Sequence, residues 1–133
     1  MIFNAQVILD KKSKKTLTIG PENTVQDAVE IMAKEKISAL PVIKDGTVIG
    51  IISERDYIRK AAPKRQLPWD ILVSDIMTSD VITIPTSETI TGCMQIMTNN
   101  RIRHLPVMDN NDLVGIISIT DVLRVLRSVN FMP

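Results

Sequence analysis

One stretch of the chain occurs twice at a fixed offset, and this duplication limits the possible folds more than any other feature. The segment from Arg101 to Leu126 follows the segment from Lys36 to Ala61, without a gap, at a distance of 65 positions (118 − 53). Both copies contain a Leu-Pro-Val triplet and a Gly-Ile-Ile-Ser-x-x-Asp motif, which ends at Asp56 or Asp121. Because self-similarity at a fixed period defines the structural unit, we predict two equivalent units and expect the function where they meet.

The size of each copy suggests that the two fold together. The chain has 133 residues, an ordinary length for one domain, whereas each copy has roughly 60 residues, a size at which a core is marginal. We therefore expect two half-domains that share one core. The formal net charge is only +1, so overall charge predicts no binding to nucleic acid or membrane surfaces.

The basic run Lys11–Lys15 is the one local exception to this charge balance. It is either a solvated loop or a contact for phosphate or an acidic partner. Nucleic-acid binding is the weaker alternative, because aromatic residues make up only 3% of the chain.

The single cysteine and the absence of long apolar runs bear on the compartment. Cys93 has no partner for an internal disulfide and aligns with Ala28 on an apolar helical face. The sequence lacks a signal-peptide pattern and any run of about 20 apolar residues. We expect a cytoplasmic protein that does not contact membranes.

Hydrophobic periodicity predicts the same order of elements in each copy: strand, helix, strand, strand, helix. Residues 4–10 are expected to form a helical turn or two, and the capping pair Thr24 and Asp27 opens the next helix. The apolar run Val48–Ile52 predicts a strand that is buried on both faces. The other expected elements are strands at Lys15–Ile19, Ala39–Ile43, Val81–Ile84, His104–Met108 and Leu113–Ile117, and helices from Ser53 to about Ala62, from Thr89 and from Ser118.

The predicted fold class is α/β (α+β), with two β-α-β-β-α units related by a pseudo-twofold axis and packed through their sheets. Residues 7–62 form the first domain, 73–127 the second, and 63–72 a proline-rich linker that Trp69 anchors to the body. Such symmetry would leave two equivalent clefts between the units.

The repeated motif has the residues for binding a small ligand. Ser53 and Ser118 stand where a strand passes into a helix, and each aspartate follows in the first helical turn. A helix N-terminus attracts anions, a hydroxyl can donate to a phosphate oxygen, and a carboxylate can accept from a ribose diol. The alternative is a capping box, in which both side chains bind their own backbone.

Basic residues distinguish the second copy. Arg101, Arg103 and His104 stand where the first copy has Lys36, Ser38 and Ala39. Arginine suits phosphate, although plain surface charge is the alternative. One histidine and one cysteine cannot form a zinc site, and no glycine-rich phosphate loop is present. We therefore expect no enzymatic activity and no metal.

Three features that are repeated in register resemble a tandem pair of CBS domains, named after cystathionine β-synthase. They are the LPV strand, the Gly-hydrophobic-hydrophobic-Ser-x-x-Asp motif and the IMT-x-x-V-x-T segment at Ile76–Thr83. The resemblance covers residues 7 to 127. It implies a regulatory module (also called a Bateman module) that binds AMP, ADP or ATP, or else NAD or S-adenosylmethionine.

The resemblance also implies roles for residues at the matching positions. Asp56 and Asp121 would hold the ribose hydroxyls, the two motif serines would lie near phosphate or ribose, and Arg103 and His104 would contact phosphate. The remaining expected ligand-binding residues are Thr120, Val81, Thr83 and Ile84, and in the first copy Thr18, Ile19, Ser38, Ala39 and Arg55. The first copy departs from the pattern at Ser38 and Ala39, so its cleft is expected to be weaker, differently liganded or empty.

The resemblance further implies a homodimer, formed through helices, that regulates a separate protein. The competing hypothesis is a ligand-free interaction scaffold in which both Ser-x-x-Asp motifs are only helix caps. Titration with adenosine-containing ligands separates the two.

Overall fold

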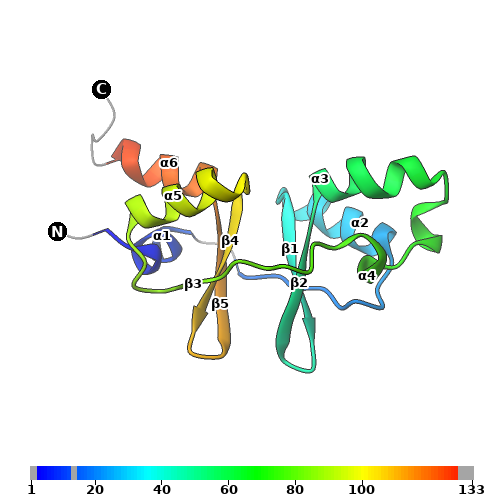
Figure 1. The fold of residues 1–133 in the computed structure, drawn as a ribbon, viewed down its shortest axis with the longest axis horizontal. Helices are drawn as coiled ribbons and strands as arrows, with labels where there is room; N and C mark the ends of the chain where they lie inside the picture. Colours follow the sequence, from blue (N-terminus) through cyan, green and yellow to red (C-terminus); the bar gives the residue numbers. More distant parts are fainter. Residues whose placement is uncertain (1–2, 13–14, 129–133) are drawn as a thin grey trace. The chain divides into compact units, whose positions relative to one another are not determined.

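The chain folds into two units, and neither unit coincides with one copy of the repeat. In the computed structural model, which describes residues 3–12 and 15–128, the first unit is Leu17–Val81 and the second unit joins Met1–Thr16 to Ile82–Pro133. Each unit contains a β-hairpin and the helices that cover it (Figure 1). The segment that precedes each copy in sequence therefore folds with the other copy.

In the first unit, β1 (Ala39–Lys44) and β2 (Thr47–Ser53) form an antiparallel hairpin. The turn between them has positive φ at Asp45 and Gly46, as the Asp-Gly pair predicts. The predicted strand Lys15–Ile19 is wrong, because within the described residues it contributes only a single parallel bridge, from Ile19 to Val42.

The helix before this hairpin, α2 (Val25–Glu35), begins at the predicted cap. Thr24 accepts from the Asp27 N–H, and the Asp27 carboxylate accepts from the Thr24 N–H, which satisfies two otherwise free amide groups. The helix ends at Lys36, which adopts the left-handed conformation. Its buried side chains, Val25, Ala28 and Met32, lie on one face as the periodicity predicts.

The helical segment after β2 is longer and less regular than predicted. It passes from α3 (Glu54–Asp56) through a π-helical turn, η1 (Tyr57–Ala61), to a 3₁₀ turn, η2 (Ala62–Lys64). Pro63 does not stop it, because proline is tolerated in the first turn of the 3₁₀ segment, where its missing N–H is not needed. The left-handed residue Arg65 follows η2.

The predicted linker lies within the first unit. It includes η3 (Pro68–Asp70) and is followed by α4 (Val73–Ile76). The predicted anchoring by Trp69 is wrong, since this residue is 57% exposed, whereas Ile71 is only 2% exposed. A branched aliphatic residue therefore fixes the segment, and the larger tryptophan side chain remains mostly in solvent.

The second unit repeats the architecture, with a short strand where the first unit has only the Ile19–Val42 bridge. Its sheet has the order β3 (Ile84–Pro85), β4 (His104–Asp109), β5 (Asp112–Ser118), with β3 parallel to β4 and a β4–β5 hairpin. The sheet is covered by α1 (Ala5–Lys11), α5 (Ile90–Asn100) and α6 (Ile119–Ser128). The strand predicted at Val81–Ile84 is displaced toward the C-terminus.

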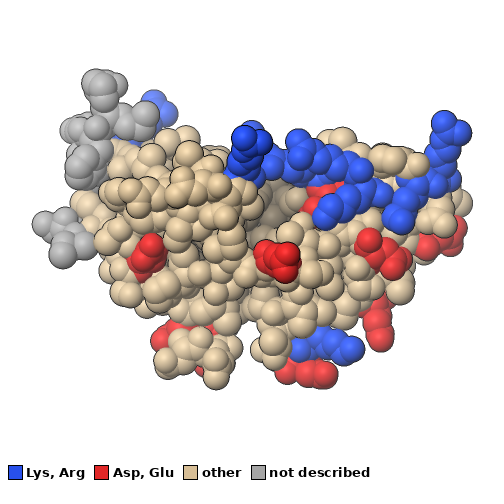
Figure 2. Space-filling model, in the orientation of Figure 1, with Lys and Arg blue, Asp and Glu red and all other residues tan. Residues whose placement is uncertain are grey.

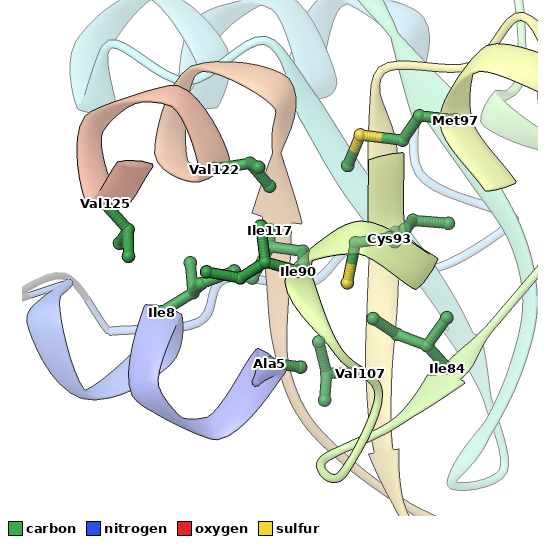
Figure 3. Close-up of a cluster of buried hydrophobic side chains, with 11 residues drawn as sticks. Ala5, Ile8, Ile84, Ile90, Cys93, Met97, Val107, Ile117, Val122 and Val125 are labelled. Atoms are coloured by element: carbon green, nitrogen blue, oxygen red, sulfur yellow. The ribbon is translucent and has the colours of Figure 1, made fainter. Parts of the chain in front are cut away.

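The buried hydrophobic residues form two clusters, one in each unit, and the expectation of one shared core is therefore wrong. Figure 3 shows the cluster of the second unit, which includes Ile8 of α1, Val125 of α6 and Ile117 of β5. The segments that precede each copy supply part of each core, Ala5 and Ile8 in one and Val73 and Ile76 in the other. These additions enlarge cores that would otherwise be marginal.

Strand β2 is not buried on both faces as predicted. Only Gly50 and Ile52 are buried, and the residues between and beside them are half-buried. Within residues 3–12 and 15–128, no helix is both long and apolar enough to cross a membrane.

Candidate functional site

The first motif forms a complete capping box at the start of α3. The Ser53 N–H donates to Oδ2 of Asp56 at 2.9 Å, and the Asp56 N–H donates to Oγ of Ser53 at 3.2 Å. Asp56 is only 6% exposed although it is an acid. The predicted cap is therefore present, and it holds a carboxylate in a buried position where the strand β2 becomes a helix.

Two further groups contact Asp56. The hydroxyl of Thr78 donates to Oδ1 at 3.1 Å, and Nζ of Lys60, one turn later in the helical segment, lies 3.1 Å from the same oxygen. Thr78 is held in place by its backbone, which exchanges two hydrogen bonds with Ile51 of β2, one in each direction. The side chain of Lys60 is 45% exposed, so this ion pair is local and largely solvated.

The second motif forms the same capping box at the start of α6. The Ser118 N–H donates to Oδ2 of Asp121 at 2.8 Å, and the Asp121 N–H donates to Oγ of Ser118 at 3.1 Å. Asp121 is 8% exposed. The two motif aspartates thus have equivalent local positions.

The partners of Asp121 beyond its own helix differ from those of Asp56. Nζ of Lys12, just after α1, lies 2.8 Å from Oδ2 of Asp121 and donates to the carbonyl of Ile116 at 2.7 Å. Ile116 is equivalent to Ile51, whose carbonyl accepts from the Thr78 N–H at 2.8 Å in the first unit. One ammonium group of Lys12 therefore contacts the same two sites that the backbone and hydroxyl of Thr78 contact in the first unit.

The environment of Asp121 lowers its pKa. Burial alone raises the pKa of this carboxyl, but the hydrogen bonds from Lys12 and from the Ser118 N–H, together with the positive charge of Lys12, outweigh it. Arg124 contacts this carboxylate only weakly, since its Nη1 is 3.5 Å from Oδ1 and its side chain is 71% exposed. The charged form of Asp121 is thus held mainly by Lys12 and its own cap.

The other residues predicted in the second copy lie around this motif in different ways. His104 opens β4 and pairs in register with Ser118, and the Arg103 carbonyl accepts from the Ile119 N–H at 2.9 Å. The side chains of Arg103, Thr120 and Thr83 are exposed, whereas Ile84 is buried in the core. The structure thus brings the start of β4 together with the motif, and the side chain of Ile84 packs in the core.

The first copy shows the same arrangement with smaller side chains. Ala39 pairs in register with Ser53, and the Ser38 carbonyl accepts from the Glu54 N–H at 3.0 Å. Thr18 is exposed, Ile19 is buried, and Arg55 and Val81 are half-buried. The predicted residues Thr83 and Ile84 belong to the second unit, so Val81 is separated from them by the unit boundary.

Three residues that contact the motif aspartates, Lys12, Lys60 and Thr78, were not predicted. Lys60 follows Asp56 by four positions, so the sequence could have predicted an i,i+4 ion pair on a helix. Thr78 closes the Ile-Met-Thr triplet, which indicates a special position without naming its partner. No local pattern could identify Lys12, because 109 positions separate it from Asp121. The Lys11–Lys15 run is thus not simply a solvated loop, although residues 13 and 14 lie outside the described residues.

The helical segment that begins with α3 carries a dense local group of positive charges. Figure 2 shows Lys and Arg atoms gathered over the helical segment that begins with α3, which carries Arg55, Arg59, Lys60, Lys64 and, just beyond it, Arg65. The equivalent helix α6 carries only Arg124 and Arg127 within its described length.

Other reactive groups offer little chemistry. Cys93 is fully buried, and burial, followed by the charge of Glu88, raises its pKa to about 11, so its thiol stays protonated near neutral pH. Among the described residues, no group of three or more His, Cys, Asp or Glu side chains could hold a metal ion.

The CBS domain family matches the chain twice, at residues 10–62 and 73–128. The CBS domain-containing protein CBSX3, mitochondrial, of Arabidopsis thaliana is 41% identical over 108 residues, which cover 77% of this chain and 52% of that protein. The CBS domain-containing protein YhcV of Bacillus subtilis is 30% identical over 117 residues, 86% of this chain and 81% of that protein. The chain therefore spans about half of the first relative and most of the second.

Solved structures show the same fold. The CBS domain protein NE2398 has a TM-score of 0.90 at 34% identity, over 96% of this chain and 99% of that one. The CBS domain pair of protein MJ0100, in complex with 5′-methylthioadenosine and S-adenosyl-L-methionine, has a TM-score of 0.84 at 26% identity, over 97% and 99% of the two chains. This chain therefore belongs to the CBS domain family and contains a tandem pair of these domains.

Proposed function

We propose that this chain is a regulatory module that binds an adenosine-containing ligand at its Gly-Ile-Ile-Ser-x-x-Asp motifs and acts on a separate protein. Family membership supports the proposal, and the MJ0100 pair was crystallised with two adenosyl compounds. The observation that carries it is the buried carboxylate at the first helical turn of each motif, Asp56 and Asp121. A carboxylate there can accept both hydroxyls of a ribose diol.

The remaining roles follow from position and chemistry. In the second copy, Ser118 and Thr120 lie beside Asp121 on the chain, and the exposed Arg103 can pair with a phosphate. We assign His104 to the same site, and its position opposite Ser118 in the hairpin register supports this assignment. In the first copy Ser38 and Ala39 take these places, and we propose that this copy binds more weakly and without a strong phosphate preference.

Calorimetric titration with adenosine, AMP, ADP, ATP, NAD and S-adenosylmethionine tests the proposal and identifies the ligand. Saturable binding of at least one of these compounds is expected.

Asp121→Asn tests the role of the carboxylate. The substitution keeps the shape of the side chain and some of its capping ability, so it should barely change the apo melting temperature. It removes the charge that would bind the ribose diol, so it should lower the affinity at least about tenfold. Deoxyribose analogues should lose affinity for the wild type but little more for the variant. Stability loss without affinity loss would mean that Asp121 is only a cap.

Arg103→Ala separates phosphate recognition from the rest. The substitution should weaken AMP by about 1.5–3 kcal/mol, the scale of a hydrogen bond to a charged group, and leave adenosine almost unchanged. Equal losses for both compounds would mean that Arg103 acts through folding or shape.

A ligand-free interaction scaffold remains the second candidate, and one observation favours it. Both motif aspartates have partners within the protein itself: each accepts from its own serine N–H and pairs with a lysine, Lys60 or Lys12. Absence of binding by every adenosyl compound at millimolar concentration would favour the scaffold.

We further propose that the chain forms a homodimer in the cytoplasm and regulates another protein in trans. Two equivalent positions on the helices that follow the motifs, Ile58 and Leu123, expose 67% and 40% of their surface, and both are large apolar residues. An apolar position repeated on both helices favours a contact through that face. Light scattering that shows a monomer at about 100 µM would exclude the dimer, since a stable interface needs roughly 1,000 Å².

A further inference from the structure

The contact between Lys12 and Asp121 has a direct consequence for any ligand that uses Asp121. The carboxylate that would receive the ribose hydroxyls already accepts a 2.8 Å hydrogen bond from the ammonium of Lys12. Lys12 comes from the N-terminal part of the chain, 109 positions away, and its side chain is 25% exposed. The contact is therefore built by the fold of the second unit and not by the helix that carries the motif.

In the first unit, no lysine from a distant part of the described chain competes with a ligand for the motif carboxylate. There Thr78, a neutral residue, contacts both the Ile51 carbonyl and the Asp56 carboxylate, and the lysine beside Asp56 is a mostly solvated neighbour on its own helix. Lys60 can swing into water at little cost, because exposed i,i+4 pairs contribute only a few tenths of a kcal/mol. Lys12 cannot do so without leaving the carbonyl of Ile116 as well.

A sugar hydroxyl is a weak replacement for an ammonium at a buried carboxylate. A charge-assisted hydrogen bond is roughly twice as strong as a neutral one, so a neutral ligand that displaces Lys12 exchanges a strong contact for a weaker one. A ligand that also brings a negative charge offers the released ammonium a new partner. The phosphate of a nucleotide is such a charge.

We propose that Lys12 determines the ligand specificity of the second copy. By its contact with Asp121, Lys12 disfavours the binding of neutral adenosyl ligands and favours ligands that carry phosphate. The inference rests on the proposed function, since it requires adenosyl binding at this motif. It assigns to the N-terminal segment a role that the repeat cannot show, because in the first unit the neutral Thr78 contacts the carbonyl and carboxylate that Lys12 contacts in the second.

Titration of adenosine and AMP into the wild type, Lys12→Met and Lys11→Met tests the proposal. Lys12→Met removes the ammonium but keeps an unbranched side chain of similar length, and it should strengthen adenosine binding about tenfold while AMP binding improves less or weakens. Lys11→Met removes an exposed charge next to it and should leave both affinities unchanged. The ratio of AMP to adenosine affinity is the decisive quantity.

A double-mutant cycle with Asp121→Asn locates the effect. If Lys12 acts through Asp121, Lys12→Met should no longer strengthen adenosine binding once the carboxylate is gone. Equal changes for adenosine and AMP, unchanged adenosine affinity, or a change that persists in Asp121→Asn would each overturn the inference and leave the proposed function standing. Failure of both compounds, and of the other adenosyl ligands, to bind any variant would overturn both.

Discussion

The two motif aspartates are alike in their own helices and different in what the rest of the fold brings to them. Asp56 and Asp121 have the same capping box, with matching donors and similar burial. The segment that precedes each copy then supplies a hydroxyl and a backbone N–H in one unit and a lysine ammonium in the other. Duplication fixed the local geometry, and the exchanged segments made the two sites chemically distinct.

The repeat alone therefore does not determine the surroundings of each motif in this fold. The residues that contact the motif across the unit come from outside the duplicated stretch, at positions where the two halves have diverged. The contact made across the unit is thus neutral at Asp56, from Thr78, and cationic at Asp121, from Lys12. The following substitutions test how far the equivalence and the difference extend.

The largest effect is expected in the cores, where the two units should behave alike. Ile52 and Ile117 are equivalent, fully buried residues of β2 and β5. Ile52→Ala and Ile117→Ala should each lower the free energy of unfolding by about 2–5 kcal/mol, because each leaves a cavity in addition to losing buried surface. Urea denaturation followed by circular dichroism measures both. A loss below about 1 kcal/mol for only one of them would show that the cores are not equivalent.

The motif glycines should reveal the exchanged segments. A Cβ at Gly50 would lie 2.6 Å from Sδ of Met77 and 3.1 Å from the backbone oxygen of Thr78, whereas at Gly115 it would meet the flexible side chain of Leu9 at 2.5 Å. Gly50→Ala should cost about 2–3 kcal/mol and Gly115→Ala about 1 kcal/mol, since only the first also crowds backbone.

A second substitution distinguishes the two causes of crowding. Leu9→Ala should relieve Gly115→Ala, so that the double variant is more stable than the sum of the single losses predicts. Met77→Ala should relieve Gly50→Ala only in part, because the backbone oxygen of Thr78 remains. Equal relief in both units would contradict the assigned difference.

The lysines beside the motifs should contribute unequally to stability. Lys12→Met removes hydrogen bonds to a carboxylate and a carbonyl, and it should lower the free energy of unfolding by about 1.5 kcal/mol. Lys60→Met removes an exposed i,i+4 pair and should cost about 0.3–0.5 kcal/mol. Thermal or urea unfolding at low salt, with Lys11→Met as the control, compares them. Equal losses would mean that the long-range contact adds nothing beyond a surface pair.

The sequence predicted the motifs and most of the elements because their determinants are local. The Thr24 cap, the Asp-Gly turn and the Ser-x-x-Asp boxes all depend on residues within four positions of one another. The exchange of leading segments could not be predicted in this way, because it depends on which core Ile8 or Ile76 enters. The prediction that Trp69 anchors its segment was wrong for a related reason, since the size of a side chain does not decide whether it is buried.

The smallest expected effect is the pH dependence that distinguishes Asp121 with and without Lys12. In the wild type the pKa of Asp121 is lowered, so its contribution to stability is fully present above the unfolded-state pKa, near 4, and is lost as the pH falls through the folded-state pKa. In Lys12→Met, burial still raises the pKa of Asp121, while the hydrogen bond and the positive charge of Lys12, which lower that pKa, are gone. The stability gap between the two proteins should therefore be constant near neutral pH and narrow below about pH 4, by at most about 1.4 kcal/mol per pH unit for one proton. Asp27, whose pKa is also lowered, is common to both proteins, so its contribution cancels in the comparison. Urea unfolding at half-unit steps from pH 6 to pH 3 measures the gap, and a gap that stays constant to pH 3 would show that Lys12 does not hold the charged form of Asp121.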